Sequence, residues 1–224
     1  MKVMLLAAGR GERMRPLTDE RPKPLLQVAG KPLIVWHLER LARAGFSDVV
    51  INVSWLGDQI IEALGDGSRY GVHIAWSREP WPALETGGGL LHAMPLLGDA
   101  PFLLVNSDVY TDVDFASLRI APDDLAQLVL VPNPPHHLQG DFWLDTRGRI
   151  GDGGGERLTY SGISLLRAGL FAGAEPGRFP LLPWLLRAKA AGKLGGQKHA
   201  GRWLDIGTPE RLRELDAELA SVRR

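Results

Sequence analysis

The strongest constraint on the fold is a series of continuous apolar strands that alternate with amphipathic helices in the first half of the chain. The expected strands and helices follow each other closely: strands at 2–8, 49–53, 72–76 and 102–105, helices at 32–44, 58–64 and 88–94. Continuous apolar strands separated by helices predict an α/β fold, with a mostly parallel sheet covered on both faces. Ligands of such sheets gather at the carboxyl ends of the strands.

The second half of the chain is less regular, and its expected elements mix strands with helices. These elements are strands at 124–131, 141–145, 158–166 and 202–206, a helix at 180–191, and a helix from Pro209 onward with Thr208 as its N-cap. Two loops rich in glycine or proline, 132–140 and 148–155, predict surface connectors or flexible lids. We expect one domain over residues 1–224, with a ligand-binding first half of about 1–110 and a second half of about 111–224.

Composition excludes several classes of function. The 26 Lys and Arg residues balance the 26 Asp and Glu residues, which argues against bulk nucleic-acid binding. The chain has no cysteine, so it can form neither a disulfide framework nor a thiolate metal site. Apolar runs are too short for a membrane span, and the N-terminus has no signal-peptide pattern. We expect a cytoplasmic protein, a monomer or weak homodimer.

A glycine turn directly after the first strand predicts an anion-binding site. Gly9 and Gly11 allow close backbone approach and aim amide groups at a ligand. Cationic residues crowd around this turn: Arg10, Arg13, Arg15, Arg21, Lys23 and Lys31. A dinucleotide-binding turn would require a glycine where Met14 stands, and a P-loop would require G-K-[S/T], which is absent. A plain strand-to-loop turn with solvated arginines is the other interpretation.

The segment from Gly9 to Thr18, with Pro22-Lys23-Pro24 after it, resembles the signature of the sugar-1-phosphate nucleotidyltransferases, G-x-G-x-R-x-x-P-L-T followed by P-K-P. The resemblance implies the Rossmann-like nucleotidyltransferase fold and binding of a nucleoside triphosphate. In the family's roles, Arg13 and the turn amides would hold the β- and γ-phosphates, and Lys23 the region of the α-phosphate. The nucleotide-binding residues implied here are Leu6, Ala7, Ala8, Gly9, Arg10, Gly11, Arg13, Lys23 and Asn106.

Two aspartates are candidate ligands of Mg²⁺. Asp108 follows an apolar strand, and Asp205 lies in a W-L-D-I-G-T segment that resembles the family's second metal motif. Two carboxylates with phosphate oxygens and waters are a usual Mg²⁺ environment. Each could instead cap a neighbouring helix or turn. Asp112 and Asp114 form a D-x-D, which suggests a nucleotide-sugar glycosyltransferase unless Asp114 is the N-cap of a helix beginning at Phe115.

The nucleobase site is expected at Glu85-Thr86-Gly87-Gly88, which resembles the family's E-T-G-G segment. A glycine hinge before a helix is the structural alternative. Glu79 is either a contact at the edge of the base or a solvated loop acid.

The sugar site is expected in the second half, with one family motif missing. The residues implied by resemblance are Asn106, Gly140, Asp141, Ser161 and Gly162. Many relatives also carry an E-K-P motif whose lysine binds the sugar phosphate, and this chain has none. Arg157 and Arg202 are the candidate replacements.

The resemblance implies attack of a sugar 1-phosphate on the α-phosphorus of a nucleoside triphosphate, with release of pyrophosphate. The compact length, the E-T-G-G-G spelling and S-G-I-S are most similar to the branch that uses UTP and N-acetylmuramic acid 1-phosphate in cell-wall recycling. Mannose- or glucose-1-phosphate nucleotidyl transfer is an alternative. A second alternative is a glycosyltransferase that uses Asp112 and Asp114. A third is a nucleotide-binding regulatory module without activity, which would be expected to lack Lys23 or Asp108, and both are present.

Overall fold

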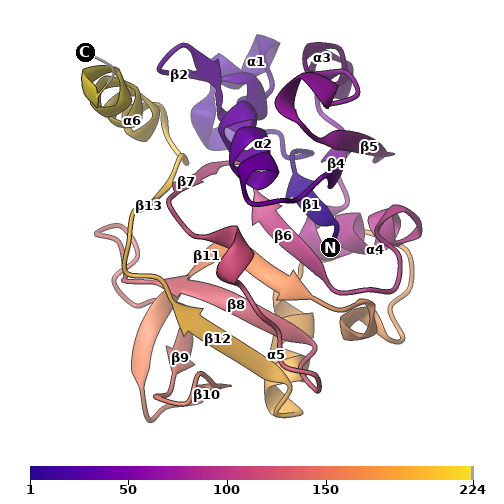
Figure 1. The fold of residues 1–224 in the computed structure, drawn as a ribbon, viewed down its shortest axis with the longest axis vertical. Helices are drawn as coiled ribbons and strands as arrows, with labels where there is room; N and C mark the ends of the chain where they lie inside the picture. Colours follow the sequence, from indigo (N-terminus) through magenta and orange to yellow (C-terminus); the bar gives the residue numbers. More distant parts are fainter. Residues whose placement is uncertain (223–224) are drawn as a thin grey trace.

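The computed structural model describes residues 1–222, in which a central mixed sheet is flanked by helices (Figure 1). The strands are β1 Val3–Leu6, β2 Gln27–Val28, β3 Lys31–Pro32, β4 Asp48–Val53, β5 His73–Arg78, β6 Phe102–Asn106, β7 Val109–Thr111, β8 Ala126–Val131, β9 Phe142–Leu144, β10 Ile150–Gly151, β11 Glu156–Leu166, β12 Leu194–Lys198 and β13 Trp203–Asp205. The α-helices are α1 Leu17–Glu20, α2 Leu33–Arg43, α3 Gly57–Leu64, α4 Glu85–Leu97, α5 Leu182–Ala190 and α6 Pro209–Val222. Short 3₁₀ turns are η1 Glu12–Met14, η2 Lys23–Leu25, η3 Ser68–Tyr70, η4 Phe115–Ser117 and η5 Ala168–Phe171.

The two halves of the chain contribute differently to the sheet. In the first half, β5, β4, β1 and β6 are parallel neighbours in that order. From the second half, β11 joins antiparallel to β6, and β8 and β9 pair antiparallel with β11. The predicted α/β fold with a mixed sheet is therefore confirmed, and its parallel pairs are concentrated in the first half.

Apolar alternation along the strands fills both faces of the sheet. Leu5 of β1 points to the face covered by α2 and α3, where it packs with Leu38 and Ile60. Met4 points to the opposite face and packs with Leu90 of α4 and with residues of α5. Both strand residues are completely buried. This two-sided burial is why the strand has no polar position.

The expected elements are confirmed to within one to three residues, and the strands that the sequence did not predict are β2, β3, β7, β10 and β12. Helix α4 begins at Glu85, not at residue 88, so the glycines of the E-T-G-G-G segment lie inside its first turns. The edge strand β12 was not expected at all. Its Gly195 and Gly196 have low strand propensity, and they pack closely in the fold: an added Cβ at Gly195 would meet the end of the Gln127 side chain, and one at Gly196 would lie 2.9 Å from Leu144 Cδ1.

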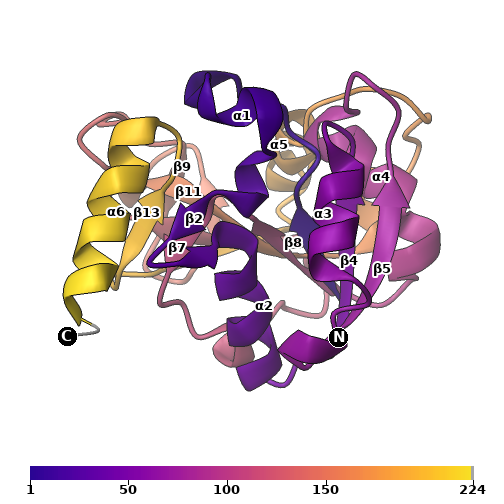
Figure 2. The same cartoon turned by 90° about the horizontal axis from the view of Figure 1, so that it is seen from above.

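The C-terminal segment returns to the first half. Strand β13 pairs antiparallel with β7, which places Asp205 opposite Val109. Helix α6 then packs beside β2, with Leu215 in a small cluster that includes Met14 and Leu26. Figure 2 shows α6 and β13 next to β2 and β7. The last helix is thereby held against the loop that carries the glycine turn.

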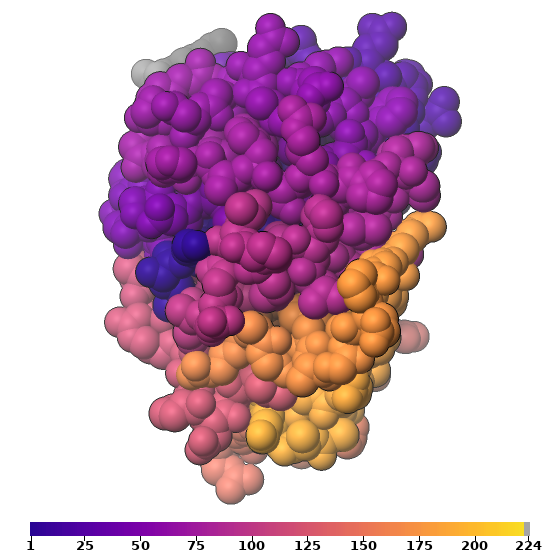
Figure 3. All heavy atoms as spheres, turned by 90° about the vertical axis from the view of Figure 1, so that its right-hand side faces the viewer, coloured from indigo at the N-terminus to yellow at the C-terminus, as the bar shows by residue number. Residues whose placement is uncertain are grey.

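The loop before α5 covers the start of α4 and joins the two halves on another side. Gly88 N donates to the carbonyl of Phe179 (3.0 Å), and Phe179 N donates to the carbonyl of Leu84 (3.1 Å). An added Cβ at Gly87 would lie 2.6 Å from the Phe179 ring, and one at Gly88 would collide with the carbonyl of Gly177. In Figure 3 the orange second-half chain lies directly against the purple first half. These glycines therefore serve close packing between chain segments.

Candidate active site

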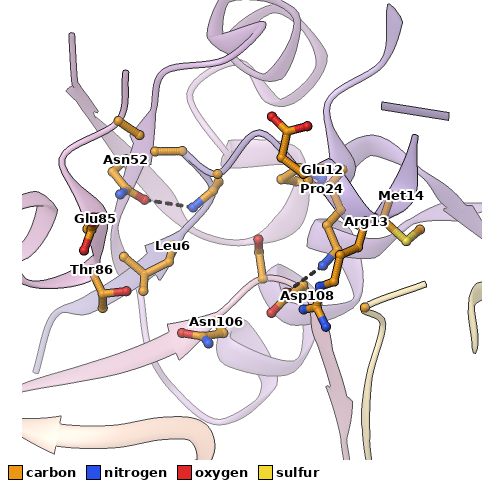
Figure 4. A pocket seen from close by; sticks show the side chains of 18 of the residues that line it. Leu6, Glu12, Arg13, Met14, Pro24, Asn52, Glu85, Thr86, Asn106 and Asp108 are labelled. Atoms are coloured by element: carbon orange, nitrogen blue, oxygen red, sulfur yellow. Dashed lines mark hydrogen bonds and ion pairs between the residues drawn. The ribbon is translucent and has the colours of Figure 1, made fainter. Parts of the chain in front are cut away.

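A cavity of about 380 Å³ opens at the carboxyl ends of β1 and β6. The predicted site residues that line it are Leu6, Ala7, Ala8, Gly9, Gly11, Arg13, Lys23, Glu85, Thr86, Asn106 and Asp108. The remaining lining residues are Glu12, Met14, Pro24, Asn52, Glu79, Ala83, Ser107 and Gly207. Figure 4 shows Arg13 and Asp108 on one side of the cavity and Glu85 and Thr86 on the other. The segments expected to bind phosphate and nucleobase thus face each other across one space.

The glycine turn is held in shape by Thr18 of α1. Gly11 adopts φ 70°, a left-handed conformation that favours glycine, and its carbonyl accepts a hydrogen bond from the Thr18 hydroxyl (2.9 Å). An added Cβ at Gly11 would lie 3.0 Å from Thr18 Cγ2 and 3.3 Å from Lys23 Cβ. The turn, α1 and Lys23 are therefore packed as one unit.

Arg10 supports this loop and is absent from the cavity wall. Its guanidinium donates to the Thr18 carbonyl (2.6 Å) and to Asp19 (2.6 Å). It also lies 4.0 Å from the centroid of the Trp55 ring, and Trp55 Nε1 donates to the same Thr18 carbonyl (3.1 Å). Trp55 in turn contacts the exposed ring of Trp81. Sequence reasoning missed this cluster because neither tryptophan belongs to a motif.

Lys23 and Asp108 form the charged centre of the cavity. Lys23 Nζ lies 2.6 Å from Asp108 Oδ2, and the two side chains are 12% and 34% exposed. Lys23 reaches this position from the 3₁₀ turn η2, while Asp108 follows β6. A partly exposed ammonium beside a carboxylate presents positive charge to an incoming phosphate and leaves carboxylate oxygen for a cation.

Asp108 and Asp205 are brought together by the β7–β13 pair. Ile206 N donates to the Asp108 carbonyl (2.7 Å), so the two aspartates lie at adjoining positions of neighbouring chain segments. Asp205 is not on the cavity wall itself, but a Cβ added to Gly207 would lie 2.9 Å from Asp205 Oδ2 and 3.2 Å from Arg13 Nη1. Within residues 1–222, no three His, Cys, Asp or Glu side chains form a metal-binding group. Two adjoining carboxylates at the edge of a cavity lined by Arg13 and Lys23 are compatible with Mg²⁺, which commonly takes its other ligands from phosphates and water.

A buried polar network that the motifs did not reveal supports the cavity floor. Asn52 Oδ1 accepts from Ala7 N (2.8 Å), and Asn52 Nδ2 donates to Glu79 Oε1 (2.6 Å). Glu79 Oε2 accepts from Leu84 N (2.8 Å). Glu79 is 9% exposed, so its interpretation as a solvated loop acid is wrong. An added Cβ at Gly89 would collide with Glu79, which is the packing reason for the third glycine of α4.

Of the expected sugar-site residues, Asn106 lines the cavity, and Gly162 is the one from the second half that contacts Asn106. Gly162 approaches Asn106 so closely that an added Cβ would be 2.7 Å from Asn106 Nδ2. Ser161 is buried, and its hydroxyl donates to the Val129 carbonyl (2.7 Å). Asp141 accepts from Tyr160 N (2.7 Å) and lies 2.9 Å from His137. Gly140, which directly precedes Asp141, has φ 60° and packs against Asn133.

The two arginines proposed to replace the E-K-P lysine have partners away from the cavity wall. The Arg157 guanidinium lies 5.9 Å from the centroid of the Trp143 ring. Arg202 pairs with Glu218 of α6 and lies 4.8 Å from the centroid of the Tyr110 ring.

The D-x-D pair is also outside the cavity. Asp114 accepts from Ala116 N (3.1 Å), which confirms it as an N-cap, although the helix is only the single turn η4. Asp112 lies 2.7 Å from His199. Both aspartates line a separate shallow depression with Arg40 and Arg43.

Sequence comparison assigns this chain to a class of enzymes. Residues 2–142 match the family model described as nucleotidyl transferase, so the chain belongs to the nucleotidyltransferase family. The family generally uses a divalent metal. No helix within residues 1–222 is long and apolar enough to cross a membrane.

The relatives narrow the class to sugar-1-phosphate nucleotidyltransferases, as expected from the sequence. The chain is 56% identical over 225 residues to the N-acetylmuramate alpha-1-phosphate uridylyltransferase of Neisseria meningitidis serogroup B, covering 97% of each chain. It is 35% identical over 234 residues to a protein of the same description from Caulobacter vibrioides, covering 98% of this chain and 97% of the relative. A Bacillus anthracis structure assigned as a glucose-1-phosphate thymidylyltransferase aligns with a TM-score of 0.83 at 20% identity, over 98% of this chain and 95% of that one, which shows the fold alone.

Proposed function

We propose that this protein transfers UMP from UTP to N-acetylmuramic acid 1-phosphate, giving the nucleotide sugar and pyrophosphate for cell-wall recycling. Nearly full-length identity of 56% to an enzyme of that description is the observation that carries the choice of substrates. The site supports the reaction class, because Arg13, Lys23 and the glycine-turn residues line one cavity with Asp108.

The reaction joins two anions, so positioning and charge neutralisation are the main tasks of the protein. An oxygen of the sugar phosphate attacks the α-phosphorus of UTP, and the bond to pyrophosphate breaks; the attacking oxygen is already anionic and needs no protein nucleophile. Arg13 and the amides of Gly9 to Gly11 hold the β- and γ-phosphates. Lys23 lies where the α-phosphate gains charge, and Glu85 and Thr86 face the base.

Asp108 and Asp205 are the residues we assign to Mg²⁺, with Lys23 keeping Asp108 oriented through their 2.6 Å contact. A bound Mg²⁺ would neutralise charge on the α-phosphate and on the departing pyrophosphate. The sugar would lie along Asn106, Gly162 and the Asp141 segment, where the second half meets the cavity.

We further propose that residues 1–224 are one catalytic domain that works in the cytoplasm as a monomer or weak homodimer. Nucleotide transfer to mannose or glucose 1-phosphate is the second candidate, since the same phosphate-binding groups would serve it. A glycosyltransferase that uses Asp112 and Asp114 has no comparable support. Asp114 caps a helical turn, and Asp112 pairs with His199.

A substrate panel tests the proposal. Pyrophosphate release is measured with UTP, dTTP and GTP, each against N-acetylmuramic acid, N-acetylglucosamine, glucose and mannose 1-phosphates. We expect the highest kcat/KM for UTP with N-acetylmuramic acid 1-phosphate, because a charged lactyl group allows strong discrimination. A preference of about tenfold or more for glucose or mannose 1-phosphate would refute the recycling assignment and leave the family assignment intact.

A further inference from the structure

A cation outside the family motifs stands next to the predicted metal site. Arg211 lies in the first turns of α6, and its side chain is 17% exposed. Arg211 Nη1 donates to the Asp205 carbonyl (3.2 Å) and forms a close ion pair with Asp205 Oδ1. The pairing of β13 with β7 places Asp205 beside Asp108, so Arg211 is tied directly to the reacting region.

A histidine from the second half completes this cluster. His136 Nε2 lies 3.1 Å from Asp205 Oδ1 and 3.2 Å from Arg211 Nη1. It comes from the proline-rich loop between β8 and β9, which Figures 1 and 2 place on the same side of the molecule as β13 and the start of α6. Through His136, the loop that precedes the expected sugar-site residue Asp141 therefore contacts both Asp205 of β13 and Arg211 of α6.

The two oxygens of Asp205 face different groups. Oδ1 contacts Arg211 and His136, whereas Oδ2 lies near Gly207, a cavity-wall residue that the guanidinium of Arg13 also approaches. Arg13 is assigned to the triphosphate. Arg211 and the expected triphosphate site are therefore on opposite sides of the Asp205 carboxylate. The Arg211 side is the one that also contacts His136, from the half of the chain that is expected to bind the sugar.

Arg211 also keeps hydrogen-bonding capacity for a ligand. In the described part of the chain, its side-chain hydrogen bonds all leave from Nη1. A guanidinium has five N–H donors in a planar fork, and the edge formed by Nε and Nη2 matches the two oxygens of a carboxylate or phosphate.

We propose that Arg211 binds the anionic group of the sugar substrate and fills the role for which the E-K-P lysine is missing, with His136 orienting its guanidinium. This inference rests on the proposed function. The anion is either the phosphate of the sugar 1-phosphate or the lactyl carboxylate, which share the same oxygen-pair chemistry. Arg157 and Arg202, the replacements expected from the sequence, have other partners.

The test uses Arg211→Gln, Arg211→Lys and the matched control Arg213→Gln. Arg213 lies two residues further along α6, is 72% exposed and pairs only at the surface with Glu210. KM and kcat are measured separately for UTP, N-acetylmuramic acid 1-phosphate and N-acetylglucosamine 1-phosphate, with thermal unfolding as the folding check. Binding of the corresponding UDP-sugars is measured by calorimetry, which needs no turnover.

We expect Arg211→Gln to raise KM for N-acetylmuramic acid 1-phosphate by about tenfold or more, as loss of a charge-assisted hydrogen bond predicts. KM for UTP should change by less than about twofold, Arg211→Lys should recover part of the loss, and Arg213→Gln should match wild type. An equal rise for both sugar phosphates assigns the phosphate as the ligand. A rise for N-acetylmuramic acid 1-phosphate alone, repeated in UDP-sugar binding, assigns the lactyl carboxylate.

An active Arg211→Gln enzyme with unchanged KM for both sugar phosphates would overturn the inference alone. So would equal weakening of UTP and sugar binding, because that pattern indicates general distortion of Asp205. Wild-type enzyme that turned over neither sugar phosphate with UTP would instead refute the proposed function, and this inference with it.

Discussion

In the hydrogen bond between Asn52 and Glu79, Asn52 is the donor and Glu79 the acceptor. Exchanging these two roles by substitution tests the hydrogen-bond network at the cavity floor. Both Glu79 oxygens face donors, the Asn52 amide at 2.6 Å and Leu84 N at 2.8 Å. Asn52 cannot turn its amide around, because its oxygen accepts from Ala7 N (2.8 Å). A glutamine at position 79 must therefore point an N–H group at another donor in either orientation.

The cost of each single change follows from these contacts. Glu79→Gln leaves a buried donor unsatisfied, which costs about 1–3 kcal/mol. At about 2–4 °C per kcal/mol for a chain of this size, Tm should fall by roughly 2–12 °C. Asn52→Asp places two carboxylates in contact, so one must take up a proton or the pair must separate.

The double variant Asn52→Asp/Glu79→Gln should restore the pattern. The new aspartate accepts from Ala7 N and from the glutamine amide, and the glutamine oxygen accepts from Leu84 N, with the net charge unchanged. We expect a favourable coupling of about 1–3 kcal/mol in a double-mutant cycle of thermal unfolding, and KM for UTP closer to wild type than in either single variant. If the double variant is as unstable as the sum of the two singles, the hydrogen-bond directions assigned here are wrong.

Three further outcomes are expected. Asp108→Asn and Asp205→Asn should each lower kcat by about a hundredfold or more in a chain that still folds, because each removes a charge from the proposed metal site; near-normal rates at limiting Mg²⁺ would exclude that site. Trp55→Leu should raise KM for UTP by a few fold, about what loss of one cation–π contact to Arg10 predicts, while Trp55→Phe recovers part of it; kinetics identical to wild type in both variants would contradict the supporting role of this cluster. Burial lowers the pKa of His37 to about 4, so the unfolded chain takes up the proton first and the free energy of unfolding falls as pH drops from about 6.5 to 4, by up to about 3 kcal/mol. His37→Leu should flatten this part of the stability profile in denaturant titrations, and an unchanged slope would disprove that origin.

The residues from which the sequence predicted a phosphate site could be grouped because they are close together in the chain and their spacing is informative. Gly9, Gly11, Arg13 and Lys23 all line the cavity. Charge alone was a poorer guide. Arg10 has the same charge as Arg13, yet its guanidinium packs on Trp55, and no local pattern indicates that a tryptophan on the segment after β4 would meet it.

Long-range pairing was the part that could not be predicted. Asn52 is an ordinary residue at the end of a strand, and only the parallel pairing of β4 with β1 brings it to Ala7. Arg211 looked like one of several charged residues on a terminal helix, since its meeting with His136 depends on how α6 and a distant loop fold back. The glycines of α4 were expected to face the base, with a hinge before a helix as the alternative; in the fold Gly87 and Gly88 pack against residues 177–180, and Gly89 against Glu79.

The pairing of β11 with β6 determines the order in which the sheet can assemble while the chain is being synthesised. During synthesis β1, β4, β5 and β6 are complete while β11, their antiparallel neighbour, has still to be translated. At about 5–20 residues per second, β6 waits on the order of 3–12 s as an open sheet edge. An open edge is a template for pairing with other chains, so the newly made first half is the species most in need of protection by chaperones. The finished nucleotide site therefore depends on the last third of the chain reaching the sheet before another molecule does.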